Sequence, residues 1–166
     1  KAISKLTYTT VGIVLTPDNI DNTIDTIRFA HGLGVSDIRI ISAAQWNKPI
    51  PRLNEVEDKI RKNHPILDYR IKHFSEGRNV RGMTKKDSKR CAIVLDDSVI
   101  AGDYHFPCVI YMREKGSPIG YVSDDMRKER KLWFDKHDCF KDKICRENCL
   151  DVCIDYNNKF RELNDK

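Results

Sequence analysis

The sequence predicts a mixed α/β protein whose two halves arrange their helices and strands differently. Near the N-terminus, a β-branched apolar run at 8–15, a segment of helical periodicity and a second short apolar run at 37–42 indicate a strand–helix–strand unit. Beyond residue 90, short apolar runs alternate with turn residues and are followed by charged segments that carry cysteines. This second pattern is typical of a small antiparallel sheet of β-hairpins followed by helices.

A helix is expected between the two N-terminal strands. Thr16 is the expected N-cap, and Pro17 suits the first helical position. Gly32 and Gly34 are expected to end the helix. The apolar positions that recur with helical period are Ile20, Ile24, Ile27 and Ala30. Because a helical crossover joins neighbouring strands that run in the same direction, the strands should be parallel, and the apolar run at 8–15 should be buried.

Two more helices are expected after a loop at 43–51. The loop contains two prolines and leaves the carboxyl end of the second strand, where α/β proteins bind ligands. The helices are expected at 53–63 and 66–74, separated by His64 and Pro65. Six apolar side chains with helical spacing should face the core, and they are Leu53, Val56, Ile60, Leu67, Ile71 and Phe74.

A polar and basic stretch at 77–90 is the expected connector between two domains, at 1–76 and 91–166. Its basic residues are Arg78, Arg81, Lys85, Lys86, Lys89 and Arg90. The stretch is interpreted either as a solvated linker or as a surface for an anionic substrate, a nucleic acid or a partner domain. Arg78 and Arg81 have the chemistry to bind a carboxylate or phosphate bidentately. The net charge of +5 is mild and no aromatic residue interrupts the stretch, so nucleic acid is not favoured.

The second domain should begin with two β-hairpins. The first is expected to join strands at 91–95 and 98–101 through a turn at Asp96-Asp97. The second is expected to join strands at 108–112 and 119–122. Together these four strands would form a small antiparallel sheet.

Helices are expected in the last part of the chain. One should span about 124–138, and a second, which carries cysteines, should span about 143–153. The side chains of the first helix that should face inward are Met126, Trp133 and Phe134. The asparagine pair at 157–158 is expected to mark a frayed end.

Three cysteines of the second helix have a spacing that favours a metal or an iron–sulfur cluster. Cys145, Cys149 and Cys153 are four residues apart, so on a regular helix their thiols would project from one face. Thiols stacked in this way are poorly placed for a disulfide but suit soft metals and clusters. Zinc sites usually contain a C-x2-C pair, which this sequence lacks. The alternative is that the thiols are free and pack as small hydrophobic groups.

The remaining donors would come from the rest of the second domain. Cys91 and Cys108 each open an expected strand, so their thiols should lie near one edge of the sheet. A [4Fe–4S] cluster needs four thiolates, and the expected set is these two cysteines with two of the three helix thiols. Cys139 is a further candidate. His105 and His137 lie close to cysteines in the sequence and are alternative ligands.

The composition indicates a globular protein in a reducing compartment. Hydrophobic residues make up 40% and charged residues 33% of the chain, and no apolar run is long enough to span a bilayer. The N-terminal residues have no signal-peptide apolar core, so the six cysteines point to metal rather than disulfides and to a cytoplasmic location. No H-E-x-x-H or G-x-S-x-G motif is present, and no catalytic residue is identified.

Two stretches of the sequence resemble radical S-adenosylmethionine enzymes. The run VGIVLTPDNIDNTIDTIRFAHGLGVSDIRIISAAQ at 11–45 is similar to the later strands and helix of the partial (β/α) barrel in that family. The later part resembles the family's C-terminal auxiliary-cluster extension, the SPASM or Twitch domain. The positions that carry this second resemblance are Cys91, Gly102 and Cys108, followed by the C-x5-C-x3-C run of Cys139, Cys145 and Cys149.

The resemblance implies an auxiliary [4Fe–4S] cluster of the one-cluster, Twitch-like form. The sequence departs from the two-cluster pattern in two places: Lys136 stands where the family has the first cysteine of its last run, and Cys153 follows Cys149 after four residues. It also implies that 1–76 is the end of a partial (β/α) barrel. The C-x3-C-x2-C motif of the family's S-adenosylmethionine-binding cluster is absent. The chain is therefore expected to be the C-terminal part of a larger enzyme, to need the missing N-terminal half as its partner, and to be inactive alone.

In that family the carboxyl end of a barrel strand contacts the adenosyl group of S-adenosylmethionine. The resemblance implies a cofactor contact at Ser42, Ala43, Ala44 and Gln45, and the alternative is an ordinary strand-to-loop junction. The auxiliary cluster would support substrate binding or electron transfer, with a peptide or protein among the expected substrates. The alternative function is a non-catalytic interaction module that is stapled by zinc and has a basic surface. No membrane partner is expected.

Overall fold

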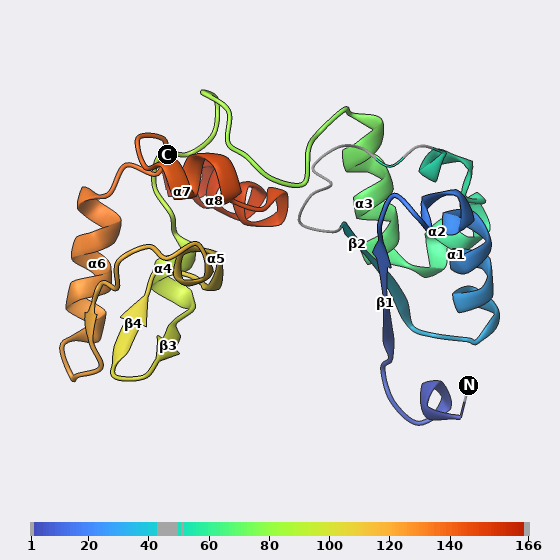
Figure 1. The fold of residues 1–166 in the computed structure, drawn as a ribbon, viewed down its shortest axis with the longest axis horizontal. Coiled ribbons are helices and arrows are strands. Elements are labelled where there is room, and N and C mark those ends of the chain that lie inside the picture. The colour runs from blue at the N-terminus through green and yellow to red at the C-terminus, as the bar shows by residue number, and fades with distance from the viewer. Residues whose placement is uncertain (1, 43–49, 51, 165–166) are drawn as a thin grey trace. The chain divides into compact units, whose positions relative to one another are not determined.

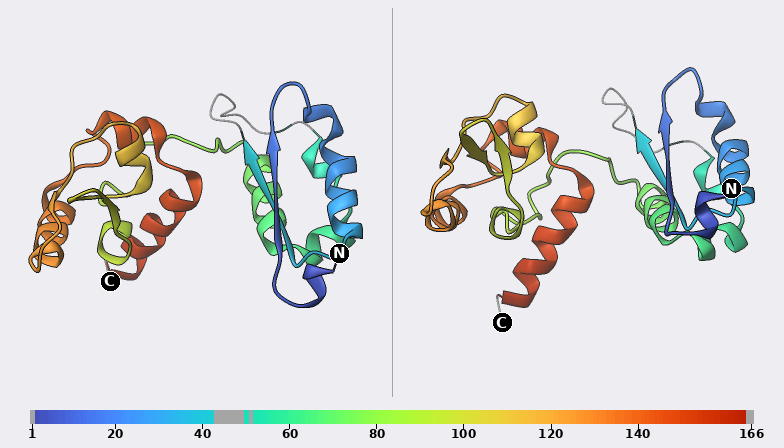
Figure 2. Two further views of the ribbon diagram at one scale, coloured as in Figure 1. Left: turned by 60° about the horizontal axis from the view of Figure 1, so that its bottom comes forward. Right: turned by 90° about the horizontal axis from the view of Figure 1, so that it is seen from below.

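The chain divides into two compact units, Lys1–Val80 and Arg81–Lys166. The structure is a computed structural model, and it describes residues 2–42, 50 and 52–164 (Figure 1, Figure 2). The first unit contains a parallel pair of strands and the second an antiparallel sheet of three strands, each with helices. The fold is therefore of mixed α/β class, as predicted. Within the described residues, the two parallel strands do not form a partial barrel.

The sheet of the first unit pairs β1 (Thr10–Leu15) with β2 (Asp37–Ser42) in parallel, which confirms the predicted strand–helix–strand arrangement. One face of this sheet is buried, and its buried residues are Ile13, Leu15, Ile38 and Ile40. On the other face, Val14 and Ile41 are 53% and 41% exposed. The strand β1 is therefore half-buried, whereas its apolar composition predicted burial throughout.

The crossover helix α1 (Thr23–Gly32) begins later than predicted. A short 3-10 turn, η2 (Ile20–Asn22), precedes it, and Thr16 is not its N-cap. The side chain of Asn19 accepts a hydrogen bond from the Thr16 amide at 2.8 Å and donates one to a β1 carbonyl at 3.1 Å, so it holds the chain in a turn after the strand. The helix ends at Gly32, and Gly34, two residues beyond, has φ +72°, so the two glycines terminate the helix as predicted.

Three helical elements complete the first unit, and their core residues agree with the prediction. They are η3 (Leu53–Glu55), α2 (Asp58–Asn63) and α3 (Pro65–Ser75), of which α3 packs along β2 (Figure 1). All six side chains that were predicted to face the core are buried: Leu53, Val56, Ile60, Leu67, Ile71 and Phe74. The helix predicted at 53–63 is divided in two because Val56 has an extended backbone, with ψ 127°.

A buried carboxylate connects β2 to the start of α3. Asp37 is 1% exposed, and its two oxygens accept hydrogen bonds from the Ile66 amide at 3.2 and 3.0 Å. One of these oxygens also accepts a hydrogen bond from the Ile38 amide at 2.7 Å. Because Pro65 opens α3 and has no amide hydrogen, the Ile66 amide is the first free donor of the helix. A carboxylate at this position caps the helix and is favoured by the helix dipole.

Removal of this carboxylate should destabilise the first unit. We expect Asp37→Ala to lower its free energy of unfolding by about 2 kcal/mol, because the Ile66 amide loses its partner. Asp25→Ala is the control, since the Asp25 side chain is 83% exposed, and it should cost less than about 0.5 kcal/mol. Amide hydrogen exchange of β1 and β2 measures both values. Equal exchange rates in the two variants would contradict the role of Asp37.

Two histidines form a second polar contact in the first unit. His64 is 1% exposed, and its Nε2 lies 3.0 Å from the Nδ1 of His31. Burial lowers the pKa of His64 below its ordinary value of 6.5, and the neighbouring His31 acts in the same direction. The hydrogen bond to the Ser36 carbonyl oxygen and the charge of Asp37 oppose this shift without reversing it.

The first unit should therefore lose stability in mild acid. The unfolded chain protonates His64 at about pH 6.5, whereas the folded unit resists this protonation. The contribution of His64 is thus complete above about pH 6.5 and is lost as the pH falls toward the lowered pKa. We expect a smaller free energy of opening from β1 and β2 amide exchange at pH 5.5 than at pH 7.5, after correction for intrinsic rates. His64→Asn should flatten this pH dependence, and a flat profile in the wild type would contradict the prediction.

The antiparallel sheet of the second unit has the order β3–β4–β5. Its strands are β3 (Val99–Ala101), β4 (Tyr104–Phe106) and β5 (Gly120–Tyr121). The turn between β3 and β4 contains Gly102, whose φ of +59° is easily adopted only without a side chain. The predictions for 98–101 and 119–122 are close to β3 and β5, but the hairpin turn is not at Asp96-Asp97, where it was predicted.

The two predicted strands that begin with a cysteine are helical. Ile93–Asp96 forms α4 and Val109–Arg113 forms α5, so the strand predictions for 91–95 and 108–112 were wrong. At the start of α5, the Cys108 sulfur accepts a hydrogen bond at 3.4 Å from the amide three residues later and serves as the N-cap. The β-branched composition of these runs gave no sign of the cap, which is formed by a residue type that rarely fills this position.

Helix α6 (Met126–Lys136) lies where a helix was predicted, but its buried side chain is Arg130, at 6% exposure. The residues predicted to face inward are only half-buried: Met126, Trp133 and Phe134.

The Arg130 guanidinium donates to four main-chain carbonyl oxygens, those of Val94, Asp97, Phe106 and Pro107. The guanidinium also lies 3.4 Å from the His105 Nδ1. Because a guanidinium only donates, Nδ1 must be the acceptor, so the proton of the His105 ring is on Nε2, which donates to Glu129 at 2.9 Å.

The cysteine-bearing segment near the C-terminus is two helices. α7 (Lys143–Asn148) ends at Cys149, and α8 (Asp151–Asn164) begins after Leu150. The backbone of Cys149 has ψ 132°, which is not helical. The prediction of one helix at 143–153 with three thiols on one face was therefore wrong.

The break between α7 and α8 is held by the residues that open the second unit. The Gly82 amide donates to the Cys149 carbonyl oxygen at 2.9 Å, and Arg81 forms a β-bridge with Leu150. These partners are far apart in the sequence, so helical periodicity cannot reveal the break. The basic stretch 81–90, which was predicted as part of a connector, thus packs within the second unit.

Candidate metal centre

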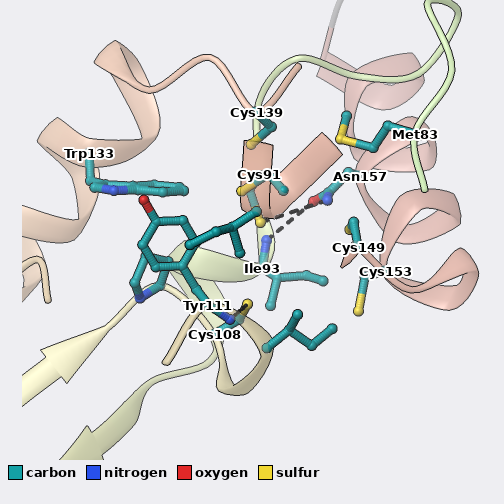
Figure 3. A pocket seen from close by; sticks show the side chains of 14 residues that line it. Met83, Cys91, Ile93, Cys108, Tyr111, Trp133, Cys139, Cys149, Cys153 and Asn157 are labelled. Atoms are coloured by element: carbon teal, nitrogen blue, oxygen red, sulfur yellow. Dashed lines mark hydrogen bonds between the residues drawn. The ribbon is translucent and has the colours of Figure 1, made fainter. Parts of the chain in front are cut away.

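All six cysteines line one cavity of the second unit, called the thiol cavity (Figure 3). Its volume is about 40 Å³, whereas one water-sized atom needs roughly 10–15 Å³. The cavity therefore suits a small inorganic group rather than a large organic ligand. Its other walls are mainly apolar and aromatic, and they include Met83, Ile93, Pro107, Ile110, Tyr111, Trp133 and Ile144.

The cysteines reach the thiol cavity from separate segments of the chain. They lie just before α4 (Cys91), at the N-terminus of α5 (Cys108), in the turn after α6 (Cys139), in α7 (Cys145), at the end of α7 (Cys149) and in α8 (Cys153). The structure thus brings together every cysteine that was predicted as a ligand. Cys139 is the most buried of them, at 3% exposure.

The thiols form two hydrogen-bonded groups. Cys91 contacts Cys139, which in turn contacts Cys145, and Cys149 contacts Cys153. The contacts with Cys139, Cys145 and Cys153 raise the pKa values of Cys91, Cys139 and Cys149, respectively, and burial acts in the same direction. The contact with Cys91 opposes the shift at Cys139 without reversing it. The contact between Cys149 and Cys153 lowers the pKa of Cys153, which accepts from Cys149. Most of these thiols are therefore protonated at neutral pH, and a metal that binds them must displace protons.

One imidazole belongs to the first of these groups. The Nε2 of His137 lies 3.8 Å from the Cys145 Sγ, and the ligand atoms of His137, Cys139 and Cys145 all lie within 4.8 Å of one another. Thiolate sulfur and imidazole nitrogen are the donors that zinc and other borderline or soft metals prefer. Burial lowers the pKa of His137, which favours the neutral imidazole with a free lone pair.

The His137 ring is held in place by its neighbours. Trp133 stacks on it, with the ring centroids 4.0 Å apart and 15° between the planes. The Tyr111 hydroxyl donates to the Asp142 Oδ2 at 2.9 Å, and this oxygen lies 3.6 Å from the His137 Nε2. Asp142 also accepts a hydrogen bond from the Cys145 amide at 3.0 Å as the N-cap of α7. The ring nitrogen is therefore directed toward both Cys145 and Asp142.

Asn157 is a residue of this site that the sequence reading missed. It is 6% exposed, its Oδ1 accepts a hydrogen bond from the Ala92 amide at 2.7 Å, and its Nδ2 donates to the Cys91 Sγ at 3.7 Å (Figure 3). The frayed end predicted at 157–158 was wrong, because α8 continues to Asn164. The signal was present: position 157 follows the buried Ile154 by one helical turn and therefore shares its face.

The other predicted site residues are not among the residues that line the thiol cavity, and some of them are outside the described residues. Ser42 is the last residue of β2 in the first unit. The remaining residues predicted to contact S-adenosylmethionine lie outside the described part of the chain, and they are Ala43, Ala44 and Gln45. Of the two arginines considered for anion binding, Arg78 donates to His73 at 2.8 Å and Arg81 donates to the Asn148 carbonyl oxygen at 3.3 Å.

Comparisons with known proteins gave no match. No protein-family model matches the chain, and no curated protein or solved structure is significantly similar to it. Among the helices of the described residues, none is both long and apolar enough to cross a membrane. The function must therefore be inferred from the geometry of the thiol cavity and from the chemistry of its donors.

Proposed function

We propose that the second unit binds an iron–sulfur cluster of the [4Fe–4S] type in the thiol cavity. The observation that carries this proposal is that all six cysteines, spread over 91–153, line one cavity whose other walls are mainly apolar. A [4Fe–4S] cluster needs four thiolates, and six thiols are within reach. Burial lowers the pKa of Arg130, and negative charge on Asp97, Cys91 and Cys108 opposes this shift. An anionic group held by these two cysteines would therefore favour the cationic form of Arg130.

The protein environment would tune such a cluster. A bound cluster supplies one-electron transfer at a potential that depends on hydrogen bonds to its sulfurs and on its exposure to solvent. Asn157 donates to the Cys91 sulfur, which favours the thiolate as a ligand. Ile93, Ile110 and Ile144 line the cavity and surround the donors with apolar groups.

We further propose that the chain is the auxiliary-cluster region of a radical S-adenosylmethionine enzyme. The cysteines that carry this resemblance all line the thiol cavity, and they are Cys91, Cys108, Cys139, Cys145 and Cys149. Gly102 lies in a hairpin turn between two of them. The second unit would support substrate binding or electron transfer, with a peptide or protein as a candidate substrate. The first unit would be the end of a partial barrel, completed by the N-terminal half of the parent enzyme.

The second candidate function is an interaction module stapled by zinc. It is favoured by His137, Cys139 and Cys145, whose ligand atoms lie within 4.8 Å of one another. This spacing approaches that around one tetrahedral ion, with Zn–S bonds of about 2.3 Å and Zn–N bonds of about 2.0–2.1 Å. The ion would then stabilise the second unit, and the basic residues at 81–90 would contact an acidic partner.

Anaerobic reconstitution with iron and sulfide tests both candidates. We expect about four irons and four sulfides per chain and a broad absorption at roughly 400 nm. Cys108→Ser should lower the iron and sulfide content, whereas Val109→Ser, at an adjacent position that is 56% exposed, should not. A colourless protein that holds one zinc would support the interaction module instead. A protein that binds neither metal would contradict both functions.

A further inference from the structure

The six thiols exceed the four that one cluster needs, and two of them share a compact group with an imidazole. Cys139 and Cys145 form a compact group with His137, in which all ligand atoms lie within 4.8 Å of one another. Around a tetrahedral zinc ion with ordinary bond lengths, such donors are roughly 3.5–3.8 Å apart. The Cys145 Sγ and the His137 Nε2 are already 3.8 Å apart. Shifts of about 1 Å would therefore close this group around a single ion.

The other four cysteines are neighbours of one another. Cys149 contacts Cys153 directly and also interacts electrostatically with Cys91 and Cys145. Cys91 contacts Cys139, so the four thiols adjoin the compact group. Cys108 interacts electrostatically with both Cys91 and Cys153. In the view of Figure 3, Cys149 and Cys153 lie together on one side of the cavity, and Cys139 lies at the end away from Cys108. Removal of the compact group thus leaves four thiols, the number that a [4Fe–4S] cluster requires.

We infer that the thiol cavity contains a second, separate metal site, in which His137, Cys139 and Cys145 bind one zinc-like divalent ion beside the cluster. The inference rests on the proposed function only in assigning the other four cysteines to iron. Three protein donors leave a fourth position on the ion, which solvent or a substrate atom fills in zinc sites of this kind.

The surroundings of His137 are those of an oriented ligand. Trp133 fixes the plane of the ring by stacking on it, and Asp142 lies 3.6 Å from the Nε2 that faces Cys145. Asp142 is itself held by the Tyr111 hydroxyl and by the Cys145 amide. Asp142 thus lies beside the nitrogen that would bind the ion, and the stacked Trp133 is the neighbour that orients the ring. The second candidate histidine, His105, is engaged by Arg130 and Glu129 instead.

Elemental analysis of the full chain, loaded anaerobically with iron, sulfide and zinc, tests this division. We expect about four irons and one zinc in the wild type. His137→Ala should lose the zinc and keep the iron, and Cys149→Ser should lose the iron and keep the zinc. His31→Ala, which removes an imidazole from the first unit, is the control and should keep both. Cobalt(II) in place of zinc should give a tetrahedral ligand-field spectrum in the wild type, which His137→Ala abolishes.

The outcomes separate the second site from the cluster. Four irons without zinc, or zinc that survives His137→Ala, would overturn the second site and leave the cluster in place. Zinc that depends on His137 in a protein without iron would support the second site and contradict the cluster, and a protein without either metal would overturn both. His137→Cys controls for misfolding, because it keeps a donor at this position. We expect this variant to retain zinc and to give a cobalt spectrum typical of thiolate ligands. Loss of zinc with retained iron would contradict direct binding of the ion by the side chain at position 137.

Discussion

Metal loading of the thiol cavity should slow amide hydrogen exchange in the second unit by about 100-fold. A ligand that binds only the folded state adds about 2.7 kcal/mol when its free concentration is 100 times its dissociation constant. The donors come from several segments between Cys91 and Cys153. A bound metal would therefore join parts of the second unit that are distant in the sequence. The slowest amides of α4, α7 and α8 are the ones to follow, in the presence and absence of metal.

The first unit provides the internal control for this experiment. Its β1 and β2 amides belong to a separate compact unit, and their exchange should be unchanged by metal. The combination of Cys149→Ser and His137→Ala removes one donor from each proposed site and should abolish the protection in the second unit. Equal slowing in both units, or protection that persists in the double variant, would show that metal acts elsewhere on the chain.

Arg130→Met should lower the free energy of unfolding of the second unit by about 3 kcal/mol. The guanidinium is 6% exposed and donates to four carbonyl oxygens that belong to two segments, 94–97 and 106–107. Methionine fills a similar space but donates nothing, so these acceptors lose their partners, at about 1–3 kcal/mol for each one that water does not reach. Amide exchange of β4, whose Phe106 carbonyl is one acceptor, gives the measurement.

Two further variants separate geometry from charge in this prediction. Arg127→Met replaces an exposed arginine of the same helix and should change stability by less than about 0.5 kcal/mol. Arg130→Lys keeps the positive charge but cannot reach four carbonyl oxygens at once, because its donors radiate from a single nitrogen. It should therefore fall between the wild type and Arg130→Met. A lysine variant as stable as the wild type would show that the positive charge, and not the number of hydrogen bonds, determines the stability of the second unit.

The first unit was largely predictable because its structure follows local patterns. Leu67, Ile71 and Phe74 recur at helical spacing and are buried, and the strand–helix–strand order requires the parallel pairing that is observed. The predicted start of α1 was too early, for a local reason that the amino-acid composition does not show. Thr16 was a suitable N-cap by type, but Asn19 binds its amide and delays the helix.

The second unit was predicted less well because distant contacts decide its local structure. The runs at 91–95 and 108–112 have the composition of strands, yet Asn157 accepts from the Ala92 amide before α4, and the Cys108 sulfur caps α5. Arg130 was not among the side chains predicted to face inward, since nothing in its own helix indicates the carbonyl oxygens of other segments that surround it.

Convergence of the cysteines was anticipated, but for an incorrect reason. The spacing of Cys145, Cys149 and Cys153 suggested one helical stripe, whereas the chain breaks at Cys149 and α8 then directs Cys153 into the same cavity. His137 was named as an alternative ligand because it lies near Cys139 in the sequence. Its position beside Cys145 could not be derived from the sequence, because it depends on how the turn after α6 packs against α7.

The hydrogen bonds of Gly82 with Cys149 and of Ala92 with Asn157 join residues that are synthesised at different times. A ribosome delivers the chain from its N-terminus, so these contacts cannot form before α8 has emerged. At about 5–20 residues per second, Cys91 leaves roughly 3–12 seconds before Cys153. During that interval the early thiols have no cavity around them and must be kept reduced by the surrounding medium. Binding of the proposed metal would therefore be a late step in the maturation of this protein, after the last cysteine is in place.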